Sequence, residues 1–501
     1  METLSIRFKP GALSGRVLIP GSKSISNRLL VMAYLAGMDY HPDNLSTADD
    51  TVLMQKLLGE VAAQRPRRAE GAAPRAGAVR LDCANAGTVL RFLTALLAFE
   101  PGEWLLDGSP RMRRRPIGPL VTALQAAGAV IRYGGEAGYP PLRIRGVNPA
   151  SVIHKIWDID ASLSSQYVSA LMLAACRVPG GVRLRMAGEK TVSKPYIRMT
   201  AGLLCAAGMR VDGPDGVAPH GGSSLKDASA TSLTYCTCNV GGSSLKDASA
   251  GCDIRIGGAL NGGWPPYVEP DWSSASYFYG LLALGDGGDL FLPGLRKDSC
   301  QGDSIVAEWF EAWGIESRFE SGGLRLCRRE KRRPAMIELD FTHQSDLLQT
   351  MAVVCAGGGV EARFTGIKNL RYKETDRVTA VVTELNRLGF RAEVRGEDEM
   401  TVAPRRPAIL AEQAVSSSGF PAAMSDHPQT ASSRIGTSSS GHPKTNTSPL
   451  VHTYGDHRMA LAFSMLAVLR PVLIENPAVV KKSFDTYWAS LASLGAEMDL
   501  R

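Results

Sequence analysis

The chain has 501 residues, of which 44% are hydrophobic and 21% are charged, and its formal net charge is +7. This length exceeds what a single compact core normally organises, so we expect two domains. The charge excess is mild, and no basic stripe with interleaved aromatic residues is present. The composition therefore argues against nucleic-acid binding and favours small anionic ligands.

Signals for location and metal binding are weak. No apolar run is long enough to cross a bilayer, and the early acid Glu2 argues against a signal or transit peptide. We expect a cytoplasmic protein that does not bind membranes, with its nine scattered cysteines reduced in the core. Cys236 and Cys238, with Cys252 nearby, have no matching His or Cys pair at zinc spacing, so we expect no metal site there.

One type of predicted helix recurs six times along the chain, each time ending in glycine before a short strand. Apolar residues recur at intervals of three and four in each copy, and the glycine stands where a left-handed C-cap is needed. The copies are Leu53–Gly59, Leu120–Gly128, Met199–Gly208, Val306–Gly314, Val378–Gly389 and Tyr487–Gly495.

A second type of predicted helix begins with a polar residue and continues with small apolar residues, as helix N-termini prefer. Its copies start near Ser26, Asn85, Ser164, Ser273, Ser345 and Asp456. Because the two types alternate, we predict six repeated α/β units, three in each domain.

The spacing of the repeat glycines lengthens in two places, which indicates insertions. The first, about 212–262, contains the decapeptide 221–230, which recurs at 241–250. The second, about 405–450, is rich in Ser, Pro, Thr and Ala and has no periodicity. We expect both, and a shorter Ala/Arg/Gly-rich stretch at 62–77, to be exposed and flexible.

Several polar helix starts lie beside cations. Gly21–Arg28 combines a glycine turn, hydroxyl groups, a lysine and an arginine, Asn85–Thr88 precedes Arg91, and Asp456–Arg458 opens the last helix. A helix N-terminus offers free N–H groups and a partial positive charge to anions. One such start is usually only a cap, but four in equivalent places, including Ser164–Gln166, predict an anion-binding site.

Two further segments are dense in charge. Arg111–Pro116 places four arginines ahead of a helix, and Asn369–Arg377 contains Lys373, Glu374 and Arg377 in one stretch. A solvated basic loop and an ordinary surface ion pair are the alternative interpretations.

In this order across nearly the whole chain, these blocks resemble the signature segments of the 5-enolpyruvylshikimate-3-phosphate synthase family. The most specific are Gly21–Ser24 and Lys373–Arg377, supported by Ser193–Tyr196. The resemblance implies an α/β enolpyruvyl transferase fold: two domains, each of three βαβαββ units, with the active site in the interdomain cleft. We expect one domain at 1–21 plus 265–501 and the other at 22–264.

The resemblance also implies the reaction, in which the enolpyruvyl group of phosphoenolpyruvate moves to the 5-hydroxyl of shikimate 3-phosphate and phosphate leaves. This is a step of the shikimate pathway to chorismate and aromatic amino acids. Binding two phosphates and two carboxylates calls for many cations, preferably guanidiniums, and the proton transfers call for acid–base groups. No metal or organic cofactor is implied.

Residue roles follow from the family by position. The residues expected to hold shikimate 3-phosphate are Lys23, Ser24, Arg28, Ser164, Ser165, Gln166, Ser193, Asp346, Asn369 and Lys373. Those expected to hold phosphoenolpyruvate are Lys23, Gly87, Arg115, Gln166, Arg377, Arg458 and Lys482. Asp346 is the expected base toward the 5-hydroxyl and Glu374 the expected proton donor to the methylene carbon, with Lys23 assisting either step.

The chain departs from the family pattern at two places. Phe92 follows Arg91 where many members have proline, which leaves sensitivity to the inhibitor glyphosate open. Lys482–Asp485 lacks a common proline after the phenylalanine, and Lys481 makes the choice of lysine ambiguous by one residue.

Two other functions remain as alternatives. The related UDP-N-acetylglucosamine enolpyruvyl transferase typically carries a mobile-loop cysteine where this chain has Arg111–Gly118 without one. A non-catalytic anion- or RNA-binding relative would have no reason to keep Asp346 and Glu374 among cations. We expect the enzyme to act as a monomer on its two small-molecule substrates.

Overall fold

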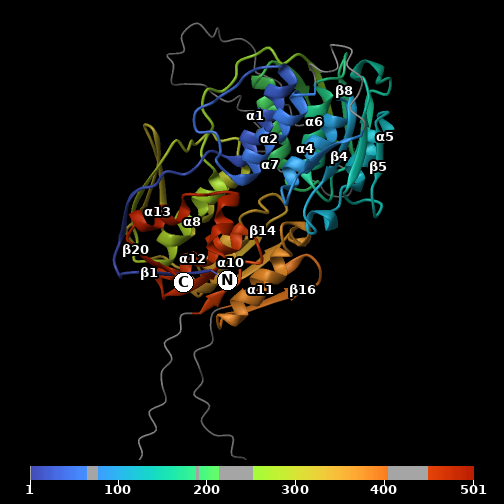
Figure 1. Cartoon of the computed structure of the whole chain (residues 1–501). Helices are drawn as coiled ribbons and strands as arrows, with labels where there is room; N and C mark the ends of the chain where they lie inside the picture. The colour runs from blue at the N-terminus through green and yellow to red at the C-terminus, as the bar shows by residue number, and fades with distance from the viewer. Residues whose placement is uncertain (1, 65–76, 188–190, 214–251, 404–448) are drawn as a thin grey trace, which may run out of the picture.

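The computed structural model describes residues 2–64, 77–187, 191–213, 252–403 and 449–501 (Figure 1). Its buried apolar side chains form two separate clusters. One gathers residues between Leu4 and Ile19 with residues between Trp272 and Leu494. The other gathers residues between Ile25 and Val268. Each cluster is the core of one lobe in Figure 1, and the N-terminal strand β1 lies in the same lobe as the C-terminal elements.

The repeated unit is a four-stranded mixed sheet covered by two helices. In one copy the first strand pairs in parallel with the second, and the remaining two strands add in antiparallel fashion, giving the order β14-β15-β17-β16. Its elements are β14 (Met336–Asp340), α10 (Leu348–Gly358), β15 (Glu361–Thr365), α11 (Arg377–Arg387), β16 (Arg391–Arg395) and β17 (Glu399–Ala403). This succession is the expected βαβαββ unit.

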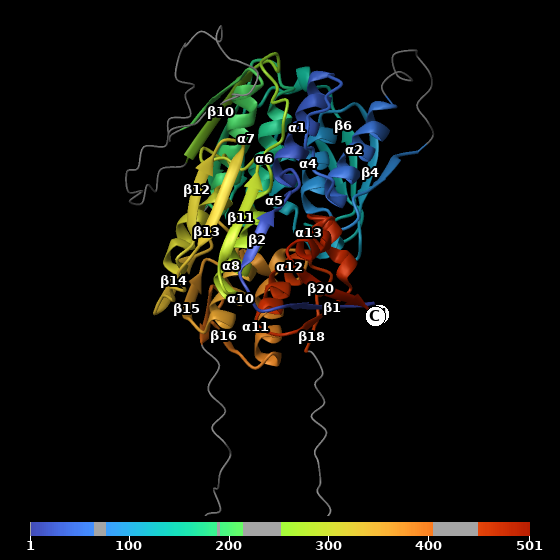
Figure 2. The ribbon, with the colours of Figure 1, turned by 90° about the vertical axis from the view of Figure 1, so that its left-hand side faces the viewer.

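Four more sheets repeat this strand order within the described residues, and one of them borrows its last strand from the start of the chain. In the second lobe they contain β3 (Val79–Asp82), α4 (Gly87–Ala98), β4 (Gly102–Asp107), α5 (Gly118–Ala126), β5 (Val130–Tyr133) and β6 (Leu142–Gly146), then β7 (Ile156–Asp160), α6 (Ser165–Ala175), β8 (Val182–Ala187), α7 (Lys194–Ala206), β9 (Met209–Asp212) and β10 (Cys252–Gly258). In the first lobe they contain β2 (Leu13–Arg16), α8 (Trp272–Leu284), β11 (Gly288–Pro293), α9 (Val306–Trp309), β12 (Glu316–Glu320) and β13 (Gly323–Arg328), then β18 (Leu450–Val451), α12 (His457–Ser464), β19 (Val472–Glu475), α13 (Tyr487–Ser493), β20 (Ala496–Leu500) and β1 (Thr3–Phe8). Figure 2 shows β2 alongside β11, its parallel partner. The predicted fold class is confirmed.

The sixth unit contains α1 (Lys23–Ala36) and α2 (Asp49–Ala62). Around it the described chain forms only the isolated bridges Gly21↔Pro270 and Asp43↔Tyr267. The first bridge joins the two segments by which the chain passes between the lobes, and there the Ser22 N–H also donates to the Glu269 carbonyl at 2.8 Å. The second bridge joins the loop between α1 and α2 to the second of these segments. The two connections are therefore held side by side.

The predicted glycine caps are confirmed at five of the six repeats. The glycines at 128, 208, 314, 389 and 495 all have positive φ, which L-residues rarely adopt. Gly59 is the exception: α2 continues to Ala62, so this glycine lies inside the helix, and the expected cap there is wrong. The reason is that Glu60, Val61 and Ala62 continue the helical pattern that Gly59 interrupts only weakly.

The predicted polar helix starts agree with the structure to within three residues. Ser164 and Asp456 are N-caps, and their side chains accept hydrogen bonds from the backbone of Gln166 and Arg458. The cap of α8 is Asp271 rather than Ser273. The helix expected near Ser345 begins at Leu348 without a side-chain cap.

Most of the two insertions, including both copies of the decapeptide, and most of the stretch at 62–77 lie outside the described residues. Among the helices that the structure describes, none combines the length and the apolar character that a membrane span requires.

Close packing at Gly280 generates a test of the fold. A Cβ added there would lie 2.2 Å from Met465 Sδ and 3.0 Å from Val354 Cγ2, so Gly280→Ala must displace the buried Met465 side chain. We expect the free energy of unfolding to fall by about 1–3 kcal/mol, measured by urea denaturation.

The matched control is Gly59→Ala, because a Cβ there meets nothing within 4 Å. This change should stabilise the protein by about 0.5–1 kcal/mol through the better helix propensity of alanine. Equal effects of the two substitutions would contradict the packing described for α8.

Candidate active site

A cleft between the two lobes brings together polar side chains from both. Its empty volume, including its open mouth, is about 960 Å³. Its lining consists of Lys23, Ser24, Arg28, Asp50, Gly87, Thr88, Arg91, Arg115, Pro116, Leu163, Ser164, Ser165, Gln166, Tyr167, Ser193, Tyr196, Asp346, Asn369, Tyr372, Lys373, Glu374, Arg377, His457 and Arg458. Every site residue predicted from the sequence lines this cleft except Lys482. Lys482 lies next to a residue of the lining, because its Nζ is 3.6 Å from Glu374 Oε1. The neighbouring Lys481 is exposed, so the structure places Lys482 at the site.

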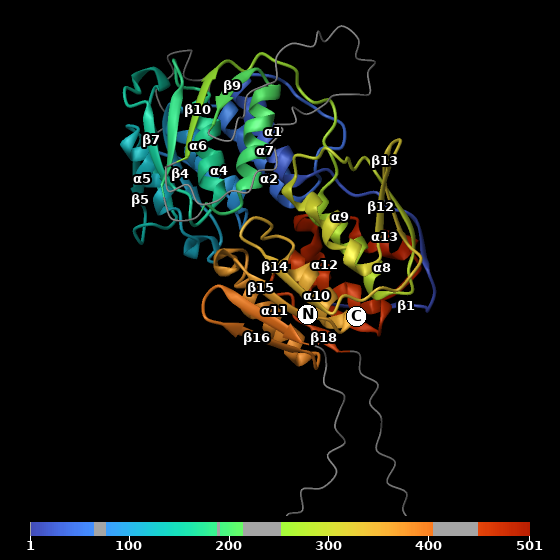
Figure 3. The ribbon, with the colours of Figure 1, turned by 180° about the vertical axis from the view of Figure 1, so that it is seen from behind.

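Helices from both lobes have their N-termini at the cleft. The first residues of α1, α4 and α6 line it from one lobe, and those of α11 and α12 line it from the other. Figure 3 shows α1, α4, α6 and α7 gathered in the one lobe and α10, α11 and α12 in the other. Because each N-terminus carries partial positive charge and free N–H groups, the cleft is suited to anionic ligands.

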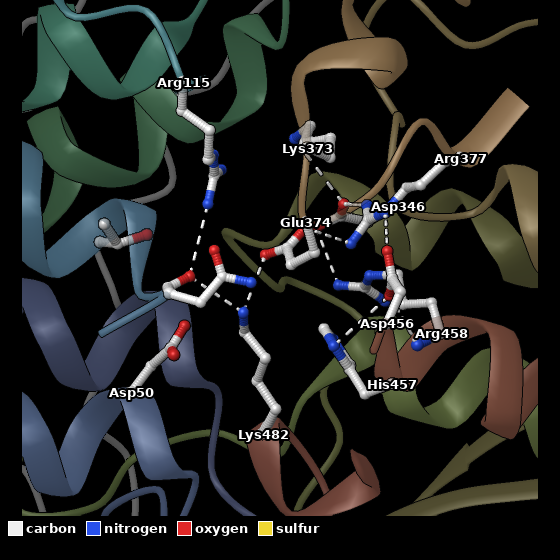
Figure 4. A network of polar contacts seen from close by, with 12 residues as sticks. Asp50, Arg115, Asp346, Lys373, Glu374, Arg377, Asp456, His457, Arg458 and Lys482 are labelled. Carbon is white, nitrogen blue, oxygen red and sulfur yellow. Dashed lines mark hydrogen bonds and ion pairs between the residues drawn. The ribbon is translucent and has the colours of Figure 1, made fainter. Parts of the chain in front are cut away.

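The most connected charge of the site is the Arg377 guanidinium, which is 2% exposed. It donates to Asp346 at 2.7 Å, to Glu374 at 2.8 Å and to Asp456 at 2.8 Å (Figure 4). A buried guanidinium needs compensating charge, and three carboxylates provide more than one unit of it. Burial by itself would lower the pKa of Arg377, but Asp456 and the other carboxylates raise it above the ordinary value.

Asp346 lies where several cations converge. Besides Arg377, it accepts a hydrogen bond from Arg458 at 2.8 Å and from the Tyr196 hydroxyl at 3.2 Å, and Lys373 Nζ lies 3.8 Å away. Burial alone would raise the pKa of Asp346, but Arg458, Lys373 and Arg377 hold it well below its ordinary value. The carboxyl is therefore ionised at neutral pH, as a base must be.

Glu374 lies between the two lobes. Its carboxylate receives the Arg377 hydrogen bond and faces Lys482, whose Nζ also donates to the Asn85 carbonyl of the other lobe at 3.0 Å. Burial would raise the pKa of Glu374, but Arg377, Lys482 and Arg115 hold it well below its ordinary value. In the ligand-free protein this group is an anion and carries no proton to donate.

Lys23 is paired with a residue that the sequence did not reveal. Its Nζ lies 3.1 Å from Asp50 Oδ2, and both side chains are largely buried. Burial lowers the pKa of Lys23, but Asp50 and Glu374 outweigh it and the net shift is upward. Asp50 was missed because α2 begins at Asp49, four residues before the predicted start; the acidic pair Asp49–Asp50 was the available helix-start signal.

Three buried arginines of the cleft form no ion pair with a carboxylate among the residues that the structure describes. The first, Arg91, donates to Gln166 Oε1 at 2.9 Å and to the Pro116 carbonyl at 3.2 Å. Arg115, 3% exposed, donates to the Asn85 carbonyl at 3.4 Å. Arg28 donates to Thr200 and Ser169 hydroxyls and to backbone carbonyls. Burial lowers the pKa of the Arg28 and Arg115 guanidiniums to about 10, so both remain charged at neutral pH. Buried cations without counter-charges indicate where anionic ligand groups bind.

Gly87 makes room for two of these arginines. A Cβ at this first residue of α4 would lie 2.5 Å from Arg91 Nη1 and 2.6 Å from Arg115 Nη2. The unusual Phe92 is buried one turn further along, with the Arg28 guanidinium carbon 5.4 Å from its ring centroid. Phe92 therefore contacts an arginine predicted to bind substrate without lining the cleft itself.

His457, for which no role was predicted from the sequence, is buried in the cleft wall. Its Nδ1 lies 3.6 Å from Asp456 Oδ1, which is beyond hydrogen-bond length. Burial, then Lys23 and Arg458, lower its pKa well below the ordinary value, so the imidazole is neutral. Within the described residues no group of three His, Cys, Asp or Glu side chains is arranged to hold a metal ion.

Comparison with known proteins gives consistent similarities. The sequence model of the family described as EPSP synthase (3-phosphoshikimate 1-carboxyvinyltransferase) matches residues 8–231 and 242–491. A protein from Bacteroides fragilis named 3-phosphoshikimate 1-carboxyvinyltransferase is 33% identical over 97% of this chain and 96% of its own. One of the same name from Laribacter hongkongensis is 34% identical over 97% of both. A solved EPSP synthase from Acinetobacter baumannii, 19% identical, superposes with a TM-score of 0.61 over both full chains, which shows the fold.

The depressed pKa of Glu374 generates a prediction about stability and pH. An unfolded glutamate has a pKa of about 4.3. Because the folded pKa is lower, the ionised carboxylate stabilises the folded state fully above pH about 4.3, and this contribution is lost as the pH falls through the folded pKa. Glu374→Gln should therefore unfold more easily than the wild type at pH 7, by about 1–3 kcal/mol, with the difference shrinking below pH 4.

Urea denaturation of both proteins between pH 7 and pH 3.5 measures this difference. Glu136→Gln, a change at an exposed position, is the control and should leave the curve of stability against pH unchanged. A difference that grew toward acidic pH would mean that the folded pKa of Glu374 is raised.

Proposed function

The chain belongs to the EPSP synthase family, and from this premise we propose how its own residues carry out that family's reaction. The enzyme transfers the enolpyruvyl group of phosphoenolpyruvate to the 5-hydroxyl of shikimate 3-phosphate and releases phosphate, in the shikimate pathway to chorismate and aromatic amino acids. The observation that best supports the residue assignment is the cleft itself, which holds buried cations without counter-charges beside two ionised carboxylates.

Shikimate 3-phosphate would lie mainly against the lobe that contains α1, α6 and α7. The proposed contacts there are Lys23, Ser24, Arg28, Ser164, Ser165, Gln166 and Ser193. Asp346, Asn369 and Lys373 would approach from the other lobe. The hydroxyls and the N-terminus of α6 suit a phosphate, and Arg28 lacks the anion that a substrate carboxylate or phosphate would supply.

Phosphoenolpyruvate would bind between the lobes. Its proposed contacts are Lys23, Gly87, Arg115, Gln166, Arg377, Arg458 and Lys482, drawn from both sides of the cleft. Arg115 and Lys482 approach from opposite sides and donate to the same carbonyl, that of Asn85 (Figure 4). A trianionic ligand placed here would supply the counter-charge that Arg115 lacks, and this favours closure of the two lobes when the ligand is bound.

Asp346 is the proposed base toward the 5-hydroxyl. It is ionised and fixed by Arg377, Arg458 and the Tyr196 hydroxyl, so it is oriented to receive the proton. Lys373 Nζ lies 3.8 Å from Asp346, and burial lowers the pKa of Lys373 from its ordinary value, so Lys373 is a candidate to share that proton. A proton accepted by Asp346 therefore stays within a connected network of charged groups.

Glu374 is the proposed proton donor to the methylene carbon, and for this it must first gain a proton. Phosphoenolpyruvate would favour this protonation, because its negative charge offsets that of Arg377, Lys482 and Arg115, the cations that lower the pKa of Glu374. The bound substrate would thus raise the pKa of Glu374 toward neutrality, and Lys23 would assist either proton transfer.

We further propose that the enzyme is a cytoplasmic monomer, and that its domains are 1–21 plus 265–501 and 22–264. The two buried clusters, which separate between Ile19 and Ile25 and between Val268 and Trp272, support this division.

Phosphate release from phosphoenolpyruvate tests the reaction and the role of Asp346 together. The wild type should release phosphate with shikimate 3-phosphate and not with UDP-N-acetylglucosamine, the acceptor of the related transferase. Asp346→Asn keeps the shape of the side chain but cannot take a proton, so turnover should fall by at least about 100-fold. Its affinity for shikimate 3-phosphate, measured by calorimetry, should change much less.

The matched variant is Arg115→Ala, which removes a proposed anchor of phosphoenolpyruvate and leaves the acid–base groups in place. It should raise the KM for phosphoenolpyruvate by about 10-fold or more with shikimate 3-phosphate affinity retained. Wild-type turnover and affinity in both variants would overturn the site assignment. Release with the nucleotide sugar alone would overturn the acceptor.

Proton uptake provides a separate test of Glu374. If phosphoenolpyruvate raises the pKa of this carboxyl, forming the complex with both substrates near pH 6–7 should take up protons, seen by calorimetry in buffers of different ionisation enthalpy. Glu374→Gln has no group to titrate there and should lose most of this uptake. The same uptake in wild type and variant would mean that another group is the proton donor.

A further inference from the structure

Arg111, the first arginine of the basic run, has a role that the proposed substrate contacts leave unexplained. It is half-buried, precedes the 3-10 turn η1 (Met112–Arg114), and does not line the cleft. Its Nε donates to the Glu374 carbonyl at 3.2 Å, and its Nη2 donates to the carbonyls of Arg371 at 3.2 Å and Lys373 at 3.0 Å. One side chain of one lobe thus binds three backbone carbonyls of the other.

The other arginines of the run are used differently. Arg113 pairs with Asp107 of its own lobe, Arg114 is exposed, and Arg115 faces the cleft. Arg111 is therefore distinguished by where its donors point rather than by its charge. A guanidinium is planar and presents several N–H groups in a fixed fork, which lets it hold three nearby carbonyls at once.

The backbone that Arg111 binds carries the reactive side chains. The segment follows η5 (Lys368–Tyr372), whose last carbonyls lack partners within the turn, and it leads into α11. From it the Lys373 side chain extends toward Asp346 and the Glu374 side chain toward Arg377 and Lys482. Fixing the carbonyls of residues 371, 373 and 374 fixes the points from which both side chains start.

We propose that Arg111 is a positioning residue that locks the segment at residues 371–374 in place when the two lobes are closed, and so sets the location of Lys373 and Glu374. The proposal rests on the proposed function of those two side chains. Other contacts also cross between the lobes, such as the Ser193 N–H to the Thr342 carbonyl at 2.8 Å. The Arg111 contacts differ because they bind the backbone of the catalytic segment directly.

The consequence is a specific kinetic pattern. A displacement of about 1 Å in a reacting group costs on the order of 100-fold in rate, so Arg111→Ala should lower kcat at saturating substrates by about 10–100-fold. Affinity for shikimate 3-phosphate should fall less than about 5-fold, because most of its proposed contacts lie in the lobe that contains α1, α6 and α7 and remain intact. Arg111→Lys keeps the charge but not the fork, and should recover only part of kcat.

Arg114→Ala is the matched control, since it removes an equal charge three residues away. Its kcat should stay within about twofold of wild type. If Arg111→Ala behaved like Arg114→Ala, the proposal would be wrong. If Arg111→Ala failed to fold, as thermal unfolding would show, then wild-type kcat in Arg111→Lys would overturn the proposal equally well.

Amide hydrogen exchange of the peptide covering residues 368–376 supplies a readout that needs no turnover. In at least one of two conditions, without ligand or with shikimate 3-phosphate, exchange should be at least about 5-fold faster in Arg111→Ala than in wild type. In Arg114→Ala the exchange rate should be unchanged. Unchanged exchange under both conditions would overturn the proposal even if kcat fell. Failure of the proposed function would show differently, as absence of phosphate release by the wild type itself.

Discussion

The site depends on one buried guanidinium. Arg377 joins carboxylates that precede or begin three different helices of one lobe: Asp346 before α10, Glu374 before α11 and Asp456 before α12. Removing one member of such a network leaves uncompensated charge in a buried place, which is costly. This mutual dependence keeps Asp346 ionised and holds both carboxylates at fixed positions on the cleft wall.

The two lobes differ in how their charges are balanced, and this difference accounts for the chemistry. The lobe containing Arg377 satisfies its cations with its own carboxylates, whereas Arg28 and Arg115 on the opposite wall lack such partners among the described residues. The two polyanionic substrates neutralise the cations of both cleft walls only when the lobes lie close to each other. Binding and closure are then coupled by electrostatics, and the same incoming charge adjusts the pKa of Glu374.

Contacts between the lobes have separate functions. Lys482 reaches the Asn85 carbonyl from the wall that holds Glu374, so it links closure to the proposed phosphoenolpyruvate site. Arg111 reaches in the opposite direction and binds backbone rather than substrate. Side chains that determine geometry without touching ligand are difficult to recognise by their type, because their effect lies in where the fork of donors points.

The sequence by itself determined the repeated unit and the polar helix starts, because these depend on local periodicity, capping and residue chemistry. Most of the charged residues at the cleft followed from the resemblance of its motifs to the family. It misplaced the end of α2 at Gly59, since a single glycine lowers helix propensity by too little to end a helix that tertiary packing stabilises. Only the tertiary structure decided that Asp50 pairs with Lys23, that Lys482 rather than Lys481 faces Glu374, and that Arg111 binds residues 371–374. These contacts join residues distant in the chain, and their partners are chosen by how the two lobes pack together.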